Sequence, residues 1–321
     1  MWVASGARIL SAASLLAVAS AHGLNAQEFR SGVDMVALAV TVTDGDGQTV
    51  SGLCARDFRV FDNGVPQEVA LFGSDQVALD VALVFDTSAS MLATLPMLKS
   101  GARGLLGRLR AGDRSALVEV KGTIHVPEPL TADLPRIQSA IDRLTASGNT
   151  ALYNGVYVSL RQFERERRAG RELRRQALVL FSDGVDTVSR IGFDEVTALA
   201  RALDVTIYSI TLQEEKPSGD PAVTDRVREA SWQMRTLTRD TGGLAYFPKR
   251  VWDLERIFQT IARELVNQYA IAYVAPTRAE GQTFRRVSIG LVPPSRGAAR
   301  TRTGYVVARA RGANLSGVSG R

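Results

Sequence analysis

The stretch Leu83-Val84-Phe85-Asp86-Thr87-Ser88-Ala89-Ser90-Met91 joins an apolar run to an aspartate and two serines. The apolar run predicts a buried strand, and in open α/β sheets ligand sites form beyond the carboxyl ends of the strands. We therefore expect Asp86, Ser88 and Ser90 to gather their oxygen atoms in the turn between this strand and a helix. Hard cations such as Mg²⁺ bind oxygen ligands, so these three residues are candidate metal ligands.

Two further segments offer side chains of the same kind. Thr150 lies in Gly148-Asn149-Thr150-Ala151-Leu152, just before a helical stretch, and the apolar run 177–182 ends at Asp183. An ordinary structural role is also open to each residue: Ser88, Ser90 and Thr150 can cap helices, and Asp183 can form an Asp-Gly turn. Taken together, five such residues in the predicted loops of one sheet favour a shared site.

With these residues the chain resembles a von Willebrand factor type A (VWA) domain with a metal-ion-dependent adhesion site. That family combines a D-x-S-x-S loop, a Thr in a second loop and an Asp in a third, and Asp86, Ser88, Ser90, Thr150 and Asp183 match these positions. The resemblance implies that the serines, and often the threonine, contact the metal directly, while the aspartates act largely through water. It also implies that a carboxylate of a partner takes the remaining coordination position. The flanks resemble the secreted VWFA-related proteins of acidobacteria.

Residues 78–268 alternate strand-like and helical patterns, which predicts an α/β fold with a doubly wound, mainly parallel six-stranded sheet and helices on both faces. Strands are expected at 81–85, 116–120, 123–126, 177–182, 206–211 and 244–247. Helices are expected at 95–110, 134–144, 152–166, 193–203, 227–240 and 253–268. Residues 216–224, which contain two prolines and a glycine, predict an inserted loop.

The flanks of this region have the two-residue period of β-strands. In residues 27–77 apolar side chains alternate, and Asp44-Gly45-Asp46-Gly47 and Asn63-Gly64 predict tight hairpin turns. The same period returns in residues 269–308. We therefore expect the two flanks to form one small antiparallel β module, followed by a disordered tail at 309–321.

The first 26 residues predict a secretory signal peptide, because Arg8 precedes an apolar stretch and small residues follow up to Ala26. We expect an exported protein, in the periplasm, at the cell surface or outside the cell, with no transmembrane segment in the mature chain. Cys54 is the only cysteine, which excludes an internal disulfide, and a buried, hydrophobic role is expected for it.

The residue inventory disfavours catalysis and nucleic-acid binding. Of the two histidines, His22 falls in the predicted signal peptide and His125 in a predicted edge strand, so a histidine triad or zinc site has no basis. The net charge of +6 comes mostly from arginines that no nucleic-acid-binding motif accompanies. We therefore predict that the chain is not an enzyme and does not bind nucleic acid.

The resulting prediction is a secreted protein-binding or adhesion module that depends on a divalent metal. Its expected cofactor is Mg²⁺, with Mn²⁺ or Ca²⁺ as alternatives, and its expected partner is a protein that presents Asp or Glu. Two other functions stay open: a non-catalytic scaffold of an envelope complex, and an accessory subunit of a metal-dependent hydrolase. The sequence leaves the oligomeric state undefined.

Overall fold

A computed structural model describes residues 35–73, 77–169, 174–212, 220–250, 252–276, 284–292 and 297–306. The predicted signal peptide and the predicted tail from residue 309 onward lie outside the described residues. The helices are α1 (Leu95–Leu106), α2 (Leu134–Arg143), α3 (Leu152–Arg168), α4 (Phe193–Ala202), α5 (Pro221–Asp240) and α6 (Asp253–Asn267), with short 3-10 helices at Ala55–Asp57 and Ala89–Met91. No described helix is both long enough and apolar enough to cross a membrane.

A six-stranded sheet with the order β10-β9-β8-β5-β6-β7 forms the centre of the α/β part. Its strands are β5 (Leu79–Asp86), β6 (Arg114–Val120), β7 (Ile124–Thr131), β8 (Arg175–Ser182), β9 (Val205–Thr211) and β10 (Ala245–Tyr246). Every neighbouring pair is parallel except β6 with β7. The predicted fold class, a mainly parallel six-stranded sheet, is confirmed.

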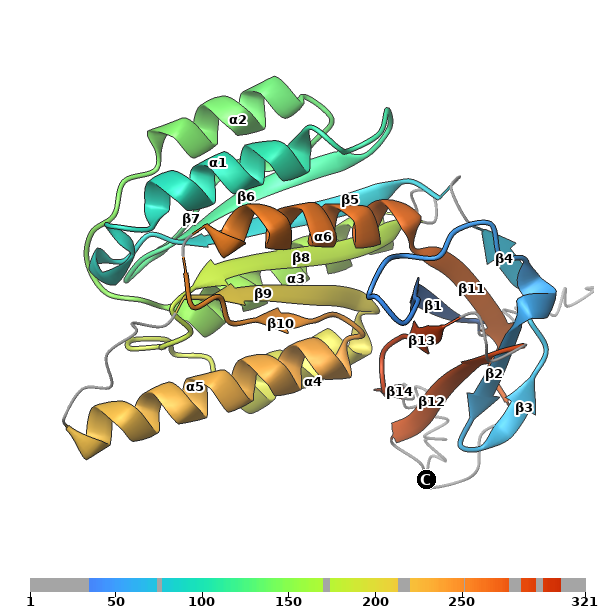
Figure 1. Ribbon diagram of the computed structural model, residues 1–321. Helices are drawn as coiled ribbons and strands as arrows, with labels where there is room; N and C mark the ends of the chain where they lie inside the picture. The colour runs from blue at the N-terminus through green and yellow to red at the C-terminus, as the bar shows by residue number, and fades with distance from the viewer. Residues whose placement is uncertain are drawn as a thin grey trace, which may run out of the picture. The chain divides into compact units, whose positions relative to one another are not determined.

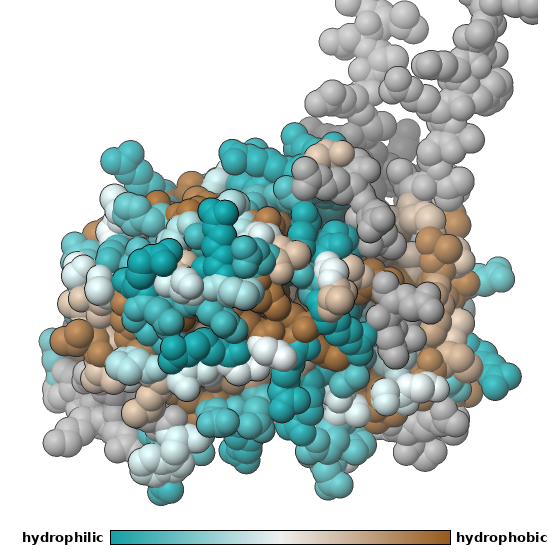
Figure 2. All heavy atoms as spheres, turned by 90° about the horizontal axis from the view of Figure 1, so that it is seen from above, coloured by the Kyte–Doolittle hydropathy of each residue, from teal (hydrophilic) through white to brown (hydrophobic). Residues whose placement is uncertain are grey.

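Helices cover both faces of this sheet (Figure 1). Leu83 and Phe85 of β5 pack in one cluster with side chains of α1, α2 and α6, whereas Ala82 and Val84 pack with α3, α4 and α5. All residues of β5 are buried, which explains why its sequence is continuously apolar rather than alternating. On the face seen in Figure 2, hydrophilic residues cover much of the surface and hydrophobic ones lie between them.

The flanks form two four-stranded antiparallel sheets, with the orders β13-β1-β11-β4 and β14-β12-β2-β3. Their strands are β1 (Met35–Thr43), β2 (Phe58–Asp62), β3 (Val65–Gln67), β4 (Leu71–Gly73), β11 (Tyr269–Val274), β12 (Phe284–Leu291), β13 (Ala298–Arg300) and β14 (Gly304–Val306). Strands from the two ends of the chain pair directly, since β1 pairs with β11 and β2 with β12. Between the sheets, the rings of Phe58 and Tyr269 lie 5.2 Å apart.

Helix α5 begins at Pro221, six residues before the predicted start, so the predicted inserted loop is wrong at its C-terminal end. A carboxylate oxygen of Asp220 accepts a hydrogen bond from the Ala222 N–H at 2.8 Å, and proline occupies the first helical turn. Both residues are strong helix-start signals. Helix α1 also differs from its predicted bounds, because it ends at Leu106 rather than at residue 110.

Cys54 also differs from its expected role. Its side chain is partly exposed rather than buried. Its thiol lies 3.1 Å from a carboxylate oxygen of Asp57, which also accepts the Cys54 N–H at 2.8 Å. Cys54 occupies the N-cap position of the 3-10 helix Ala55–Asp57, where both its N–H and its thiol contact the carboxylate of Asp57.

Candidate metal centre

The predicted ligands lie where the connections of the central sheet diverge. From β5 the chain continues into α1 on one face of the sheet, and from β8, the neighbour of β5, it continues into α4 on the other face (Figure 1). Such a divergence leaves a crevice beyond the carboxyl ends of the strands, where ligands bind in open α/β sheets. Asp86 ends β5, and Asp183 directly follows the last residue of β8.

Asp86 is fully buried, and hydrogen bonds hold both of its carboxylate oxygens. Oδ1 accepts the Ser88 N–H at 2.9 Å, and Oδ2 accepts the Ser182 hydroxyl at 2.7 Å. Because Ser182 ends the adjacent strand β8, the second bond ties the two strands together at the crevice. Asp86 forms no ion pair with any residue that the structure describes.

Burial raises the pKa of Asp86 from its ordinary value of 3.8 to about 6. The negative charge of Asp183 acts in the same direction, while the hydrogen bonds from Ser88 and Ser182 lower the pKa and offset only part of the effect. The ionised form of the Asp86 carboxyl group is therefore destabilised when no cation is bound nearby. A cation in the crevice would act in the opposite direction, because a nearby positive charge favours ionised carboxylates.

Neither predicted serine caps a helix. Ser88 stands at the N-cap position of the short helix Ala89–Met91, yet its side chain makes no capping hydrogen bond, and neither does Thr94 at the start of α1. Instead the hydroxyl oxygens of Ser88 and Ser90 lie 3.0 Å from each other. Ser88 is buried and Ser90 exposed, so the pair of hydroxyls extends from a buried position to the protein surface.

Thr150 does not cap a helix either. Helix α3 begins at Leu152 with Ala151 at its N-cap position and no side-chain capping bond. The Thr150 backbone is fixed by Thr187, whose hydroxyl accepts the Thr150 N–H at 3.0 Å and donates to the Thr150 carbonyl at 3.0 Å. Within the described residues the buried Thr150 hydroxyl itself makes no hydrogen bond, so it is available to a ligand.

Asp183 fits the turn interpretation in part. One carboxylate oxygen, Oδ1, accepts the Val185 N–H at 3.0 Å, as expected of an Asp-Gly turn. Gly184 in this turn has a φ of 85°, and a Cβ there would lie 2.9 Å from a methyl carbon of Thr211. The turn therefore requires glycine at position 184, and the carboxylate of Asp183 bonds to its backbone through Oδ1.

Backbone hydrogen bonds join the loops that carry these residues. The Ala89 N–H donates to the Gly148 carbonyl at 3.0 Å, and the Ser147 N–H donates to the Thr87 carbonyl at 2.7 Å. The loop after β5 is thereby fixed to the loop before α3, and the Thr150–Thr187 contacts fix the latter to the loop after β8. The five predicted residues thus lie on three loops that hydrogen bonds connect to one another.

The donor set fits a hard divalent cation. It consists of hydroxyl and carboxylate oxygens, the ligands that Mg²⁺ and Ca²⁺ prefer. In the described part of the chain there is no group of three or more His, Cys, Asp or Glu side chains that could hold a metal. A metal at this crevice would therefore depend on the hydroxyls of Ser88, Ser90 and Thr150 beside the two aspartates.

Two further residues shape the site without being candidate ligands. Ser182 orients Asp86, and its hydroxyl also accepts the Gly184 N–H at 2.9 Å. Thr187 holds the backbone of Thr150. A polar residue at the end of an otherwise apolar strand is the signal for Ser182, whereas nothing local indicates that Thr187 contacts a residue 37 positions away.

The family model of the von Willebrand factor type A domain matches residues 81–185, a segment that contains all five predicted ligands. No curated protein matches the chain. A VWA protein from Catenulispora acidiphila is similar in structure, with 14% identity, 86% of this chain and 73% of that chain covered, and a TM-score of 0.48.

Two further solved structures are similar to this chain. Proximal thread matrix protein 1 from the mussel byssus, with a zinc-occupied MIDAS motif, is 18% identical, with 64% of this chain and 49% of that chain covered and a TM-score of 0.48. The pilus adhesin SpaC from Lactobacillus rhamnosus GG is 9% identical, with 80% of this chain and 47% of that chain covered and a TM-score of 0.49. This chain spans about half the length of each. From the family match and the doubly wound sheet that contains the matched segment, we conclude that this chain carries a von Willebrand factor type A domain.

Proposed function

We propose that the chain is an exported protein-binding module that depends on a divalent metal ion. Ser88, Ser90 and Thr150 would hold the ion together with Asp86 and Asp183. One observation carries the proposal: three hydroxyls that cap no helix lie on connected loops next to the end of β5, where no described arginine or lysine forms an ion pair with the buried carboxyl group of Asp86. Mg²⁺ is the first choice, with Mn²⁺ and Ca²⁺ as alternatives, because all three bind oxygen donors.

The donor set also supports the choice of partner. Hydroxyl ligands are neutral, so they leave most of the charge of a divalent ion uncompensated. Such an ion gains most from an additional anionic ligand, and on a protein partner that ligand is the carboxylate of an Asp or Glu. Ser90 is exposed, which places one end of the donor set within reach of another protein.

The proposal includes the absence of catalysis. The described histidine, His125, is exposed on β7 at the edge of the sheet, and its ring nitrogen lies 3.0 Å from the Thr123 hydroxyl. It is therefore engaged outside the crevice. The two carboxylates among the candidate ligands, Asp86 and Asp183, are assigned to the metal and not to proton transfer.

Isothermal titration of the mature full-length chain with Mg²⁺ and Mn²⁺ tests the metal. The wild type should show saturable binding, and Asp86→Asn and Ser90→Ala should lose it. Ser139→Ala is the matched control, because Ser139 is exposed on α2 and its hydroxyl bonds only to the Pro135 carbonyl. Binding that is equal in the wild type and Asp86→Asn would contradict the proposal and favour a metal-independent scaffold.

The partner chemistry needs a separate experiment. Immobilised peptides that carry a single Asp, or Asn at the same position, can be offered to the protein with Mg²⁺ or with EDTA. Retention on the Asp peptide in Mg²⁺ alone is expected. Equal retention on both peptides, or retention that persists in EDTA, would show that the metal does not recognise a carboxylate.

A further inference from the structure

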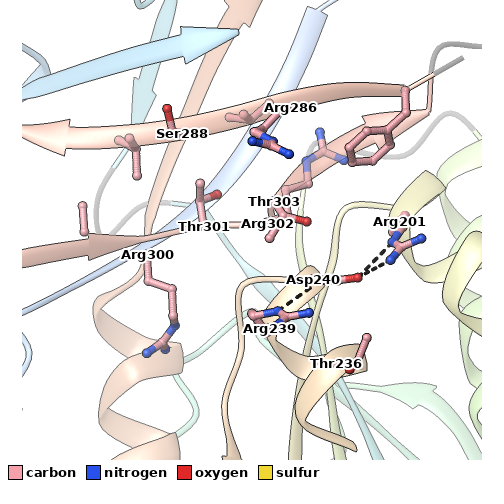
Figure 3. Close-up of a pocket in the computed structure, with 14 residues that line it drawn as sticks. Arg201, Thr236, Arg239, Asp240, Arg286, Ser288, Arg300, Thr301, Arg302 and Thr303 are labelled. Carbon is pink, nitrogen blue, oxygen red and sulfur yellow. Dashed lines mark hydrogen bonds and ion pairs between the residues drawn. The ribbon is translucent and has the colours of Figure 1, made fainter. Parts of the chain in front are cut away.

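A second candidate site lies at the opposite end of the central sheet from Asp86. A cavity of about 650 Å³ opens beside the ends of α4 and α5, where the chain enters β9 and β10, and strands of the β module form its other wall (Figure 3). Its volume falls within the range of small-molecule sites. The polar lining includes Arg201, Arg239, Asp240, Arg286, Arg300 and Arg302.

The charge in this cavity is unbalanced. Arg300 is paired with Glu264, and Arg302 with Asp204 at 3.2 Å. Arg201 and Arg239 share the single carboxylate of Asp240. Arg286 forms no ion pair with a described residue, and its side chain extends from β12 toward the wall that carries Asp240 (Figure 3). Three guanidinium groups therefore face one carboxylate, which leaves an excess of positive charge.

The cavity is held in shape by contacts behind its walls. The Thr303 N–H donates to the Asp240 carbonyl at 3.2 Å, and the Arg300 Nε donates to the Gly242 carbonyl at 2.9 Å. Gly242 has a φ of 80°, and a Cβ there would lie 2.7 Å from the backbone nitrogen of Arg302. The segment 300–303 is thus fixed against the end of α5, which positions Arg300 and Arg302 in the wall of the cavity.

Part of the lining is apolar. Phe284 lies on the same face of β12 as Arg286 and is 42% exposed, so its ring contributes apolar surface beside the guanidinium groups. An inorganic anion would leave this surface unused. A ligand with one anionic end and an apolar body would match both kinds of lining. Its phosphate or carboxylate group would bind the guanidinium groups, which form bidentate hydrogen bonds with such anions, and its body would contact the apolar lining.

We propose that this cavity binds a small organic anion, with a phosphate or carboxylate group held by Arg239 and Arg286 and an apolar body against the ring of Phe284. Because Arg239 comes from the VWA domain and Arg286 from the β module, the ligand would bridge the two. The site is independent of the metal centre, which lies at the other end of the strands.

Titration calorimetry of the full mature chain with phenyl phosphate, inorganic phosphate and phenol tests the proposal. Phenyl phosphate should bind saturably and more tightly than inorganic phosphate, and phenol should not bind. Arg286→Gln and Arg239→Gln should each weaken phenyl phosphate binding roughly tenfold, as expected for loss of one charge-assisted bond. Both side chains are exposed, and the backbone of Arg286 keeps its bonds to Asn63, so both variants should fold.

Two controls separate this site from general charge and from the metal centre. Arg228→Gln removes an exposed arginine of α5 that pairs with Asp225 outside the cavity, and it should leave binding unchanged. Asp86→Asn should also bind phenyl phosphate normally, whatever its effect on metal binding. No saturable binding of phenyl phosphate by the wild type, or equal binding by the wild type, Arg286→Gln and Arg239→Gln, would overturn the proposal.

Discussion

Two aspartates, one in the β module and one in the VWA domain, are equally buried but differ in what surrounds them. Asp62 at the end of β2 accepts hydrogen bonds from the Arg285 Nε at 2.6 Å and from the hydroxyls of Tyr273 and Tyr305 at 2.9 Å each. Asp86 at the end of β5 accepts bonds from the Ser88 N–H and the Ser182 hydroxyl, which are both neutral. One carboxylate has a counterion within the chain, and the other has none among the described residues.

The difference separates a structural from a functional role. A buried charge is costly unless it is paired, so a permanent arginine makes Asp62 part of the framework. The buried Asp86 has a raised pKa instead, and the proposed metal ion would be its counterion. The comparison predicts that the two aspartates respond in opposite ways when their charge is removed.

The largest effect is expected for Asp62→Asn, which leaves the buried guanidinium of Arg285 without this carboxylate. Breaking a buried ion pair from one side should lower the free energy of unfolding by about 3–5 kcal/mol. Urea denaturation measures the change. Asp142→Asn is the control, because its pair with Arg103 is exposed and should contribute less than about 1 kcal/mol. Equal effects of the two variants would refute the structural role of Asp62.

The opposite sign is expected for Asp86→Asn in EDTA. The pKa of Asp86 is about 6 in the folded protein and 3.8 ordinarily, so the folded state binds this proton more tightly than the unfolded state. The stability of the metal-free wild type should therefore fall as the pH rises from about 4 to about 6, by roughly 3 kcal/mol at most. Asp86→Asn should lack this decline and be the more stable protein near pH 7.

Urea denaturation in EDTA at several pH values between about 4 and about 7 tests this second prediction. A variant less stable than the wild type at every pH would mean that the hydrogen bonds of Asp86 outweigh the cost of burying its charge. Asp86 would then resemble Asp62, and the contrast between the two regions would fail.

The smallest effect on stability is expected for Thr150→Val. The Thr150 hydroxyl caps no helix, so its loss should change the free energy of unfolding by less than about 1 kcal/mol while weakening Mg²⁺ binding roughly tenfold. Thr241→Val is the matched control, because that buried hydroxyl bonds to the Ile207 N–H at 3.2 Å and the Leu237 carbonyl at 2.9 Å. It should lose stability and keep metal affinity. The reverse pattern would assign Thr150 to the framework.

The predictions from sequence were best where the structure depends on neighbours along the chain. The strand that ends at Asp86 and the helix that begins at Leu152 follow directly from apolar periodicity. The early start of α5 was missed although Asp220 and Pro221 indicate it locally. The short strand β13 (Ala298–Arg300) has no apolar alternation, and only its pairing with β1 makes it a strand.

For the candidate site, the chemical groups at the ends of β5 and β8 can be predicted from the sequence, because they directly follow strands that the apolar pattern defines. The contacts of those groups cannot be predicted in this way, because they are made between distant parts of the chain. Ser182 meets Asp86 across 96 residues, and Arg285 meets Asp62 across 223. Such contacts depend on the order of strands in a sheet, which no local pattern specifies. The counterion that Asp62 has and Asp86 lacks is therefore a property of the fold.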